Sequence, residues 1–304
     1  MAFRHQALLY AGADGFLEGT VPFLRAGALA GDAMLVVVSA AKIERLREAL
    51  GRHAARVTFA DMSRVGSNPA RIIPAWRDFV EAHPGRRLRG IGEPIWAGRS
   101  AAELVECQRH EALLNLAFAG ADDFTLLCPY DVDALDPEVV QKAHESHPML
   151  VQAETAVPSA LYTDEATIAA PFAAPLPDPP ADAHATAFDA GTLRAARAFV
   201  SARAAAAGLS HERVGDLILA VNEVTTNSVR HGGGHGVLRI WVDDDAVICE
   251  IGDAGAITEP LAGRRKPSDG RVGGHGLWLV NQLCDLVQIR AFAGGGVVRL
   301  HMRR

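Results

Sequence analysis

Long apolar runs are missing from this sequence of 304 residues. The longest apolar windows, such as residues 33–38, are far shorter than the roughly 20 residues that cross a bilayer. The first residues also lack the apolar segment of a secretory signal. We therefore expect a cytoplasmic protein with no membrane partner.

Cysteine is scarce, and the spacing of the cysteines matches no CxxC motif of metal or redox sites. The four cysteines are Cys107, Cys128, Cys249 and Cys284, and no two of them form a CxxC pair. In the absence of a secretory context, this pattern predicts reduced, mostly buried thiols.

An excess of basic residues is also lacking. The formal net charge is −6 and the sequence pI is about 6.1, which argues against direct nucleic-acid binding. Apolar residues make up 49% and charged residues 22% of the chain, so a packed core is expected. The length favours two domains.

One proline-rich stretch divides the chain. Residues 171–187 read PFAAPLPDPPADAHATA and show no apolar periodicity, which indicates a stiff, extended linker. We expect a first domain over residues 1–165, a linker over 166–187 and a second domain over 188–304.

The first domain alternates short apolar runs with helical patterns. Strands are expected at 33–39, 56–61, 88–96 and 124–131, with helices between them, which predicts an α/β domain whose parallel sheet is covered on both faces. The Walker A pattern GxxxxGK[ST] is absent, so no phosphate cradle is expected here.

The second domain places helices before strands. Helical patterns cover 192–208, 210–234 and 276–287, and strand patterns cover 236–245, 246–255 and 297–304. This arrangement favours an α/β sandwich with one helical face.

The stretch NEVTTNSVRHGGG carries Glu223 and Asn227 on one face of the second helix, because residues four apart are neighbours. An Asn oxygen is able to ligate Mg²⁺, and a Glu in reach of a hydroxyl is able to act as a general base. Alone, the pair fits a solvated helix face equally well.

Two later segments add to this pair. Strand VICEIGD runs into Asp253 and Gly255, where a carboxylate accepts a hydrogen bond from an amine and glycine admits a planar ligand. GRVGGHGLWLV then places glycines before a helix that begins near Leu277, a pattern typical of phosphate binding.

The three segments together resemble the Bergerat-type ATPase domain shared by histidine kinases, gyrase B and MutL. Their order looks most like that of the bacterial serine kinases that serve as anti-sigma factors, and the resemblance covers residues 190–304. It implies ATP and Mg²⁺ as cofactors. It also implies Glu223 as catalytic base, Asn227 as Mg²⁺ ligand and nucleotide contacts at Asp253, Gly255, Gly273, Gly274, Gly276 and Leu277.

The last strand departs from the family pattern. Many members carry a Thr there that supports the adenine-binding Asp, whereas this chain has Val297 and Val298. This difference leaves the strength of nucleotide binding open.

The resemblance implies a function and partners. We expect an anti-sigma factor and serine/threonine kinase that binds a sigma factor and phosphorylates an anti-anti-sigma (STAS-type) protein. Homodimers are usual among the resembled kinases. A nucleotide-dependent binding module with little catalysis is the alternative. A sensor histidine kinase fits less well, because His211 lies only twelve residues before Glu223 and His110 lies in the first domain.

The first domain resembles the MEDS sensory domain of methanogen and methylotroph regulators, over residues 3–155. That family is similar to P-loop ATPases of the RecA type without their catalysis. The resemblance and the ligand-binding edge of open α/β sheets point to a small ligand. The residues expected there are Glu93, Cys128, Tyr130, Asp131 and His147, with His144 nearby. Burial in the core and protein interaction are the alternatives.

Overall fold

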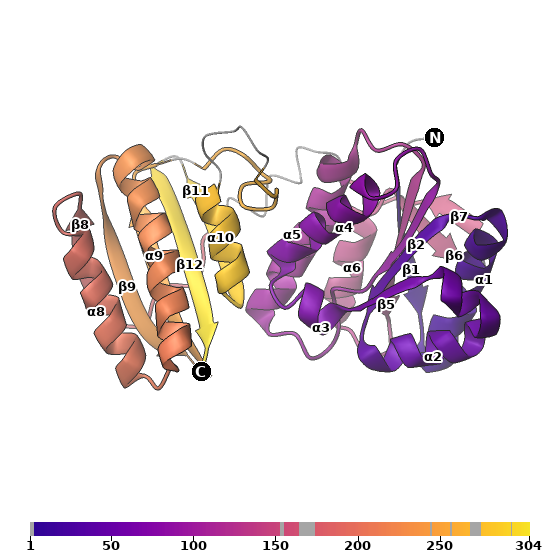
Figure 1. The fold of residues 1–304 in the computed structure, drawn as a ribbon, viewed down its shortest axis with the longest axis horizontal. Helices are drawn as coiled ribbons and strands as arrows, with labels where there is room; N and C mark the ends of the chain where they lie inside the picture. The colour runs from indigo at the N-terminus through magenta and orange to yellow at the C-terminus, as the bar shows by residue number, and fades with distance from the viewer. Residues whose placement is uncertain are drawn as a thin grey trace. The chain divides into compact units, whose positions relative to one another are not determined.

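The computed structural model describes residues 3–152, 155–163, 174–243, 245–255, 257–267, 275–292 and 294–304. The chain divides into two compact units, Met1–Ile168 and Ala169–Arg304. Each unit is built around one sheet (Figure 1).

The first unit contains a seven-stranded sheet in the order β3-β2-β4-β5-β1-β6-β7. Neighbouring strands are parallel except for the last pair, β6 and β7, which is antiparallel. The predicted parallel α/β fold is confirmed. The strands are β1 (Arg4–Tyr10), β2 (Ala33–Val38), β3 (Thr58–Asp61), β4 (Leu88–Gly92), β5 (Phe124–Asp131), β6 (Met149–Gln152) and β7 (Thr155–Pro158).

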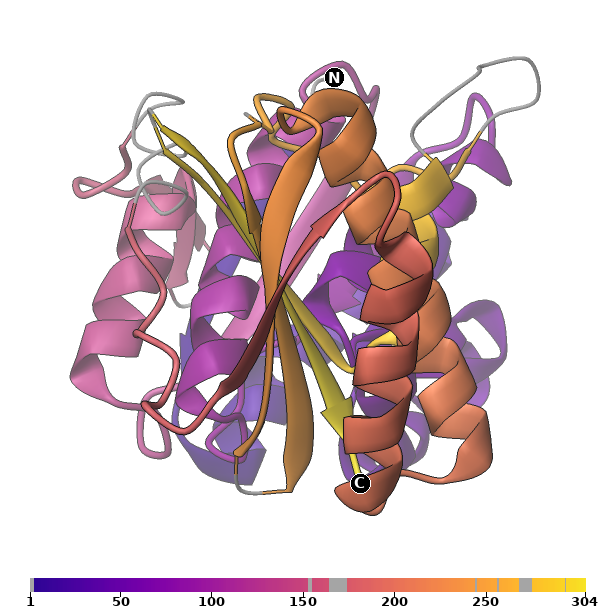
Figure 2. The same cartoon turned by 90° about the vertical axis from the view of Figure 1, so that its left-hand side faces the viewer.

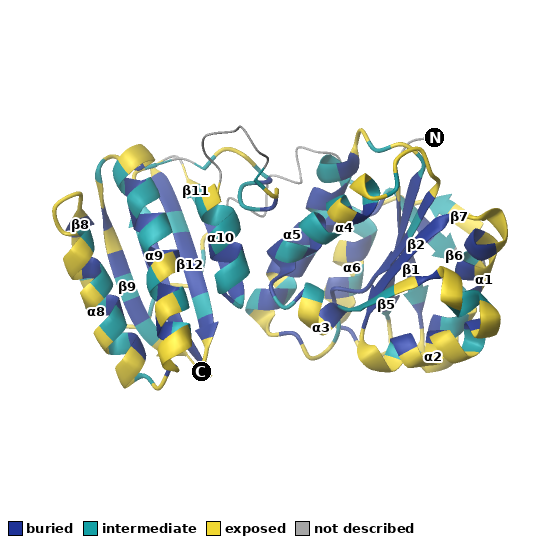
Figure 3. Cartoon of the chain, in the orientation of Figure 1, coloured by how far each residue is buried: buried dark blue, intermediate teal, exposed yellow. Residues whose placement is uncertain are grey.

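Helices cover both faces of this sheet. Figure 1 shows α1 and α2 on one face and α4, α5 and α6 on the other, so the central strands are buried (Figure 3). The helices are α1 (Gly12–Ala30), α2 (Ala40–Leu50), α3 (Met62–Val65), α4 (Ile72–Glu81), α5 (Ala101–Phe118) and α6 (Pro137–Ser146), with short 3₁₀ turns at Gly51–Arg56 and Pro69–Arg71.

Helix α5 begins at a capping box. The Glu103 backbone N–H donates to Ser100 Oγ at 3.3 Å, and the Ser100 backbone N–H donates to Glu103 Oε2 at 2.9 Å. Such a box satisfies two of the free N–H groups at a helix start. It fixes the position of a helix whose later turns carry buried polar side chains.

The second unit is a five-stranded antiparallel sheet in the order β11-β12-β10-β9-β8. Its strands are β8 (His184–Asp189), β9 (His235–Asp243), β10 (Ala246–Asp253), β11 (Leu286–Phe292) and β12 (Gly295–Arg303). Its helices are α8 (Leu193–Ala206), α9 (His211–His231) and α10 (His275–Leu283). Figure 2 shows α8 and α9 side by side on one face of the sheet, which confirms the predicted sandwich.

Two strands of this sheet were missed from the sequence. The helix predicted over 276–287 ends at Leu283, and β11 begins at Leu286. Two hydrogen bonds attach Asp285 to β12 just before β11 begins. The Asp285 N–H donates to His301 O at 3.0 Å, and Asp285 Oδ2 accepts from the Arg303 N–H at 2.8 Å. Strand β8 begins inside the segment assigned to the linker. It lies at the sheet edge and buries only Phe188, so it leaves little apolar pattern.

All four cysteines are buried and unbridged, as predicted. Among the described helices, none combines the length and the apolar composition needed to cross a membrane.

Candidate functional sites

Helix α9 positions the first pair of candidate residues. Ser210 Oγ accepts from the Arg213 backbone N–H at 3.3 Å and starts the helix. Leu217, Val221 and Val224 are buried in the core of this unit, with other apolar residues of α9. Glu223 and Asn227 lie between this apolar stripe and solvent and are partly exposed.

The start of α10 lies against these two side chains. A methyl group at Gly276 would stand 3.0 Å from Glu223 Oε2 and 3.2 Å from Asn227 Nδ2. A side chain at this position would therefore be in tight contact with both residues. Leu277 follows and packs against the core. The structure therefore brings together four predicted residues from two helices.

Asp253 lies at the end of β10, under the end of α9. Its Oδ1 accepts from the Gly255 N–H at 2.7 Å, and the Ala254 N–H donates to Gly232 O at 3.2 Å. A methyl group at Gly232 would stand 2.5 Å from Asp253 Cγ. Because Gly232 follows Asn227 by little more than one helical turn, Asp253 belongs to the same end of the sandwich as Asn227.

Strand β12 presents no hydroxyl to Asp253. Gly296 pairs with Asp253, and Val298 pairs with Ile251 on the same face and belongs to the core. Val297 pairs with Gly252 and points to the other face. Val298 is therefore the position at which a Thr would approach the Asp.

The segment after Gly255 reaches α10. Asn281 Nδ2 donates to Gly263 O at 3.0 Å, and Gly263 adopts a φ of +71°. A methyl group at Gly263 would stand 2.6 Å from Asn281 Nδ2, so the turn fits closely on the helix. The predicted phosphate contacts Gly273 and Gly274 lie outside the described residues.

A Gly232→Ala substitution tests the position of Asp253. The added methyl group would push the carboxylate away from the Gly255 N–H, so we expect a stability loss of about 1–3 kcal/mol. Because the family resemblance implies a nucleotide contact at Asp253, we also expect roughly tenfold weaker binding of an ATP analogue. Titration with a fluorescent ATP analogue measures the first effect, and thermal unfolding measures the second.

Gly215→Ala is the matched control. Gly215 lies on the exposed side of α9 with open space around its Cα, so alanine there is expected to stabilise the helix by about 0.5–1 kcal/mol and to leave binding unchanged. Equal binding by the two variants would contradict a role of this corner in recognition.

In the first unit, the predicted ligand residues fall in two separate places. The first is the carboxyl end of β1, β4 and β5. There the Tyr10 hydroxyl donates to Glu93 Oε1 at 2.6 Å, and Lys42 Nζ donates to the same oxygen at 2.5 Å. Asp131 Oδ1 accepts from the Gly12 N–H at 3.3 Å. Tyr10 and Lys42 were missed, because nothing in their local sequence relates them to Glu93.

The carboxylate of Glu93 is 4% exposed. Burial raises the pKa of Glu93, and the Lys42 ammonium and the Tyr10 hydroxyl oppose that rise. Burial and the adjacent Glu93 also raise the pKa of Tyr10, which stays protonated as a donor. This group is an ion pair between a buried carboxylate and a partly exposed lysine.

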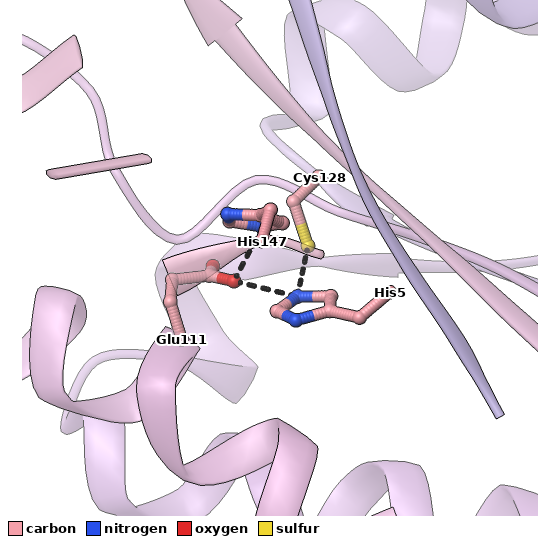
Figure 4. A group of neighbouring side chains, drawn as sticks. All are labelled: His5, Glu111, Cys128 and His147. Atoms are coloured by element: carbon pink, nitrogen blue, oxygen red, sulfur yellow. Dashed lines mark hydrogen bonds and ion pairs between the residues drawn. The ribbon is translucent and has the colours of Figure 1, made fainter. Parts of the chain in front are cut away.

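The second place is a buried cluster of four side chains between the sheet and α5, drawn in Figure 4. Cys128 and His147 come from the prediction, and His5 of β1 and Glu111 of α5 join them. His5 Nε2 lies 3.1 Å from Glu111 Oε2 and 3.4 Å from Cys128 Sγ. His147 Nε2 lies 3.3 Å from Glu111 Oε2. His5 was missed because β1 itself was not predicted.

Tyr130 borders this cluster, and its ring meets that of His147 edge-on at 5.6 Å between centroids. The predicted His144 is not one of the four side chains of the cluster. Its backbone carbonyl oxygen accepts a hydrogen bond from the Ser159 hydroxyl at 2.7 Å. Glu93 and Asp131 therefore lie at one place, and Cys128, Tyr130 and His147 lie at the other.

Comparison with protein-family models gives two matches. Residues 4–148 match the methanogen/methylotroph, DcmR sensory (MEDS) domain, and residues 186–302 match the histidine kinase-like ATPase domain. The first unit therefore carries a MEDS domain and the second a histidine kinase-like ATPase domain, which confirms the resemblances to the MEDS domain and to the ATPase domain of histidine kinases.

No curated protein matches the chain. A crystal structure of the RsbU and RsbW domains of Rv1364c from Mycobacterium tuberculosis is similar at 21% identity and a TM-score of 0.30. The match covers 40% of this chain and only 32% of the length of that one.

Proposed function

From a MEDS sensory domain joined to a histidine kinase-like ATPase domain, we propose a cytoplasmic anti-sigma regulator with serine/threonine kinase activity. In this proposal the second domain binds ATP and Mg²⁺, sequesters a sigma factor and phosphorylates an anti-anti-sigma protein, and the first domain controls it. The observation that carries the proposal is the approach of Gly276 to Glu223 and Asn227, with Asp253 at the same end of the sandwich.

The residues at this end of the sandwich have the chemistry that a bound nucleotide requires. Gly276 leaves open the space that a side chain would fill, directly over Glu223 and Asn227. Asn227 would supply an amide oxygen to Mg²⁺, which prefers oxygen ligands. Asp253 would accept a hydrogen bond from the adenine amine. The first turn of α10 would offer free N–H groups to phosphate.

Glu223 would serve as the catalytic base. It would accept the proton of the attacking serine hydroxyl as that oxygen takes the γ-phosphoryl group and ADP leaves. Glu223 and Asn227 both lie close to Gly276, so the proposed base would stand near the proposed Mg²⁺ ligand. General-base catalysis further requires that the substrate hydroxyl come within hydrogen-bond reach of Glu223.

A nucleotide-dependent binding module is the second candidate. Val298 offers no hydroxyl to Asp253, which would weaken adenine binding. A histidine kinase fits less well. His110 is buried at 1% exposure, and His211 opens the helix that carries Glu223, about 18 Å away along its axis.

Glu223→Gln separates the two candidates. With the full chain, [γ-³²P]ATP and an anti-anti-sigma protein, we expect phosphate transfer to fall by at least 100-fold in this variant, while ATP affinity stays within about threefold. General-base catalysis contributes about 10²–10⁴-fold, which sets this expectation. Glu212→Gln in the exposed first turn of α9 is the matched control and keeps full transfer.

The two candidates predict different results for the wild-type chain. Transfer that depends on Glu223 supports the kinase. Binding of ATP without transfer by the wild type favours the binding module, and a wild type that binds no ATP overturns both.

A further inference from the structure

The His5–Glu111–Cys128–His147 cluster has its ring nitrogens fixed by outer contacts. His5 Nδ1 lies 3.1 Å from Asn115 Oδ1, and the amide nitrogen of Asn115 donates to Ser146 O at 2.8 Å. Asn115 Oδ1 is thereby left as an acceptor. His147 Nδ1 lies 2.8 Å from the carbonyl oxygen of Ala143 and 3.1 Å from Ser146 Oγ, which itself donates to Lys142 O at 3.0 Å.

Both rings therefore carry a proton on Nδ1, because a carbonyl oxygen only accepts. In each neutral ring, Nε2 then carries a lone pair and no proton. Both Nε2 atoms face Glu111 Oε2, at 3.1 Å from His5 and 3.3 Å from His147. Two lone pairs directed at a carboxylate oxygen repel each other unless a cation lies among them. Glu111 Oε1 and His147 Nε2 also lack hydrogen-bond partners within the described structure.

The cluster is closed to solvent. His5, Glu111, Cys128 and His147 are each no more than 2% exposed, so the Glu111 carboxylate is shielded from water. A buried carboxylate of this kind requires a partner charge.

Three of the distances between ligand atoms are close to those of a tetrahedral site. All four ligand atoms lie within 4.8 Å of one another. Three pairs of these atoms lie 3.1, 3.3 and 3.4 Å apart. In a tetrahedral zinc site with bonds of about 2.0–2.3 Å, two ligand atoms lie about 3.3–3.7 Å from each other.

We propose that His5 Nε2, His147 Nε2, Cys128 Sγ and a Glu111 oxygen bind one divalent transition-metal ion, with zinc as the best fit. The ligand set mixes two imidazoles, a thiolate and a carboxylate, all of which zinc accepts. The contacts from Asn115 and Ala143 to the outer nitrogens are the second layer of hydrogen bonds typical of metal-bound histidine. One metal would then join β1, β5, α5 and the turn after α6.

Metal binding would deprotonate the thiol. A cysteine ligates a metal as the thiolate, so binding of one ion is expected to release a proton from sulfur. The resulting thiolate and the Glu111 carboxylate together balance the charge of a divalent ion.

The test uses the full chain without a histidine tag, dialysed against Zn²⁺ or Co²⁺ and passed over a desalting column. We expect about one equivalent of zinc by elemental analysis. The Co²⁺ form is expected to show d–d bands of tetrahedral strength and a thiolate-to-cobalt band in the near ultraviolet. Zinc is also expected to raise the melting temperature, because a ligand that binds only the folded state stabilises it.

Cys128→Ser and Cys107→Ser form a matched pair. Both thiols are buried in the same unit, but Cys107 donates to Pro94 O at 3.3 Å, outside the cluster. Cys128→Ser is expected to lose the thiolate band and at least tenfold in metal affinity, and Cys107→Ser is expected to keep both.

The wild type alone also decides the question if a variant fails to fold. Less than a tenth of an equivalent of metal in the dialysed wild-type chain would overturn the site. A thiolate band that survives in Cys128→Ser would place the metal elsewhere and would overturn it as well.

Discussion

Asn227→Ala is expected to weaken Mg²⁺-dependent ATP binding by roughly 100-fold, equivalent to about 2.7 kcal/mol. The substitution removes the proposed amide ligand to Mg²⁺, and even residues that only support a metal ligand cost 10–100-fold in affinity when lost. Alanine is a better helix former than asparagine, so α9 is expected to stay intact. Isothermal titration with ATP, with Mg²⁺ and then with EDTA, measures the effect.

Asn222→Ala is the control for this variant. It removes the same group from the same helix, but Asn222 Oδ1 accepts from Arg197 Nη1 of α8 at 2.8 Å, away from α10. Its ATP affinity is expected to stay within about threefold of the wild type. Similar losses in both variants would point to general damage to α9. Unchanged, Mg²⁺-dependent binding in Asn227→Ala would remove Asn227 from the metal site.

The sequence predicts the second unit well where local signals and motifs agree. Ser210 and the glycines after His231 set the limits of α9, and the observed helix follows them. Its apolar stripe indicates which side is buried. The proximity of Gly276 to Glu223 is a tertiary contact, and only the family resemblance suggested it.

The missed strands had weak or misleading local patterns. Strand β8 buries one side chain, and β11 continues an apolar run that begins in α10. In the first unit, β1 is an interior strand of the sheet, yet its sequence RHQALLY mixes polar residues among apolar ones. Those polar residues include His5, whose role depends on α5 and β5. No local pattern predicts such a contact, because its partners lie more than 100 residues away.

The ion pair of Lys42 could not be predicted from the local sequence either, because its partner Glu93 follows another strand. Removal of Lys42 is expected to lower the stability of the protein strongly. Lys42→Met should destabilise the protein by about 3–5 kcal/mol at neutral pH, the usual cost of leaving a buried charge unpaired. Glu93 would lose the ammonium at 2.5 Å and keep only the Tyr10 hydroxyl. Urea unfolding followed by circular dichroism measures the loss.

The size of this loss should depend on pH. The pKa of Glu93 in the folded protein is already raised above its ordinary value of 4.5, and removal of Lys42 takes away the main opposing charge. A carboxyl with a raised folded pKa contributes stability below its unfolded pKa and loses it as pH rises through the folded pKa. The difference between variant and wild type should therefore be small near pH 4.5 and should grow towards pH 8.

A double variant isolates the cause of the loss. Lys42→Met with Glu93→Gln removes both charges and keeps an acceptor for Tyr10, so most of the lost stability should return and the extra pH dependence should disappear. Lys142→Met is the control, because its ion pair with Glu145 lies on the surface, where such pairs contribute about 0–1 kcal/mol. A loss at Lys42 that is the same at pH 4.5 and pH 8, and that Glu93→Gln does not restore, would mean that the lysine stabilises the fold through the approach of its ammonium to the rings of Phe16 and Tyr10 and not through its ion pair with Glu93.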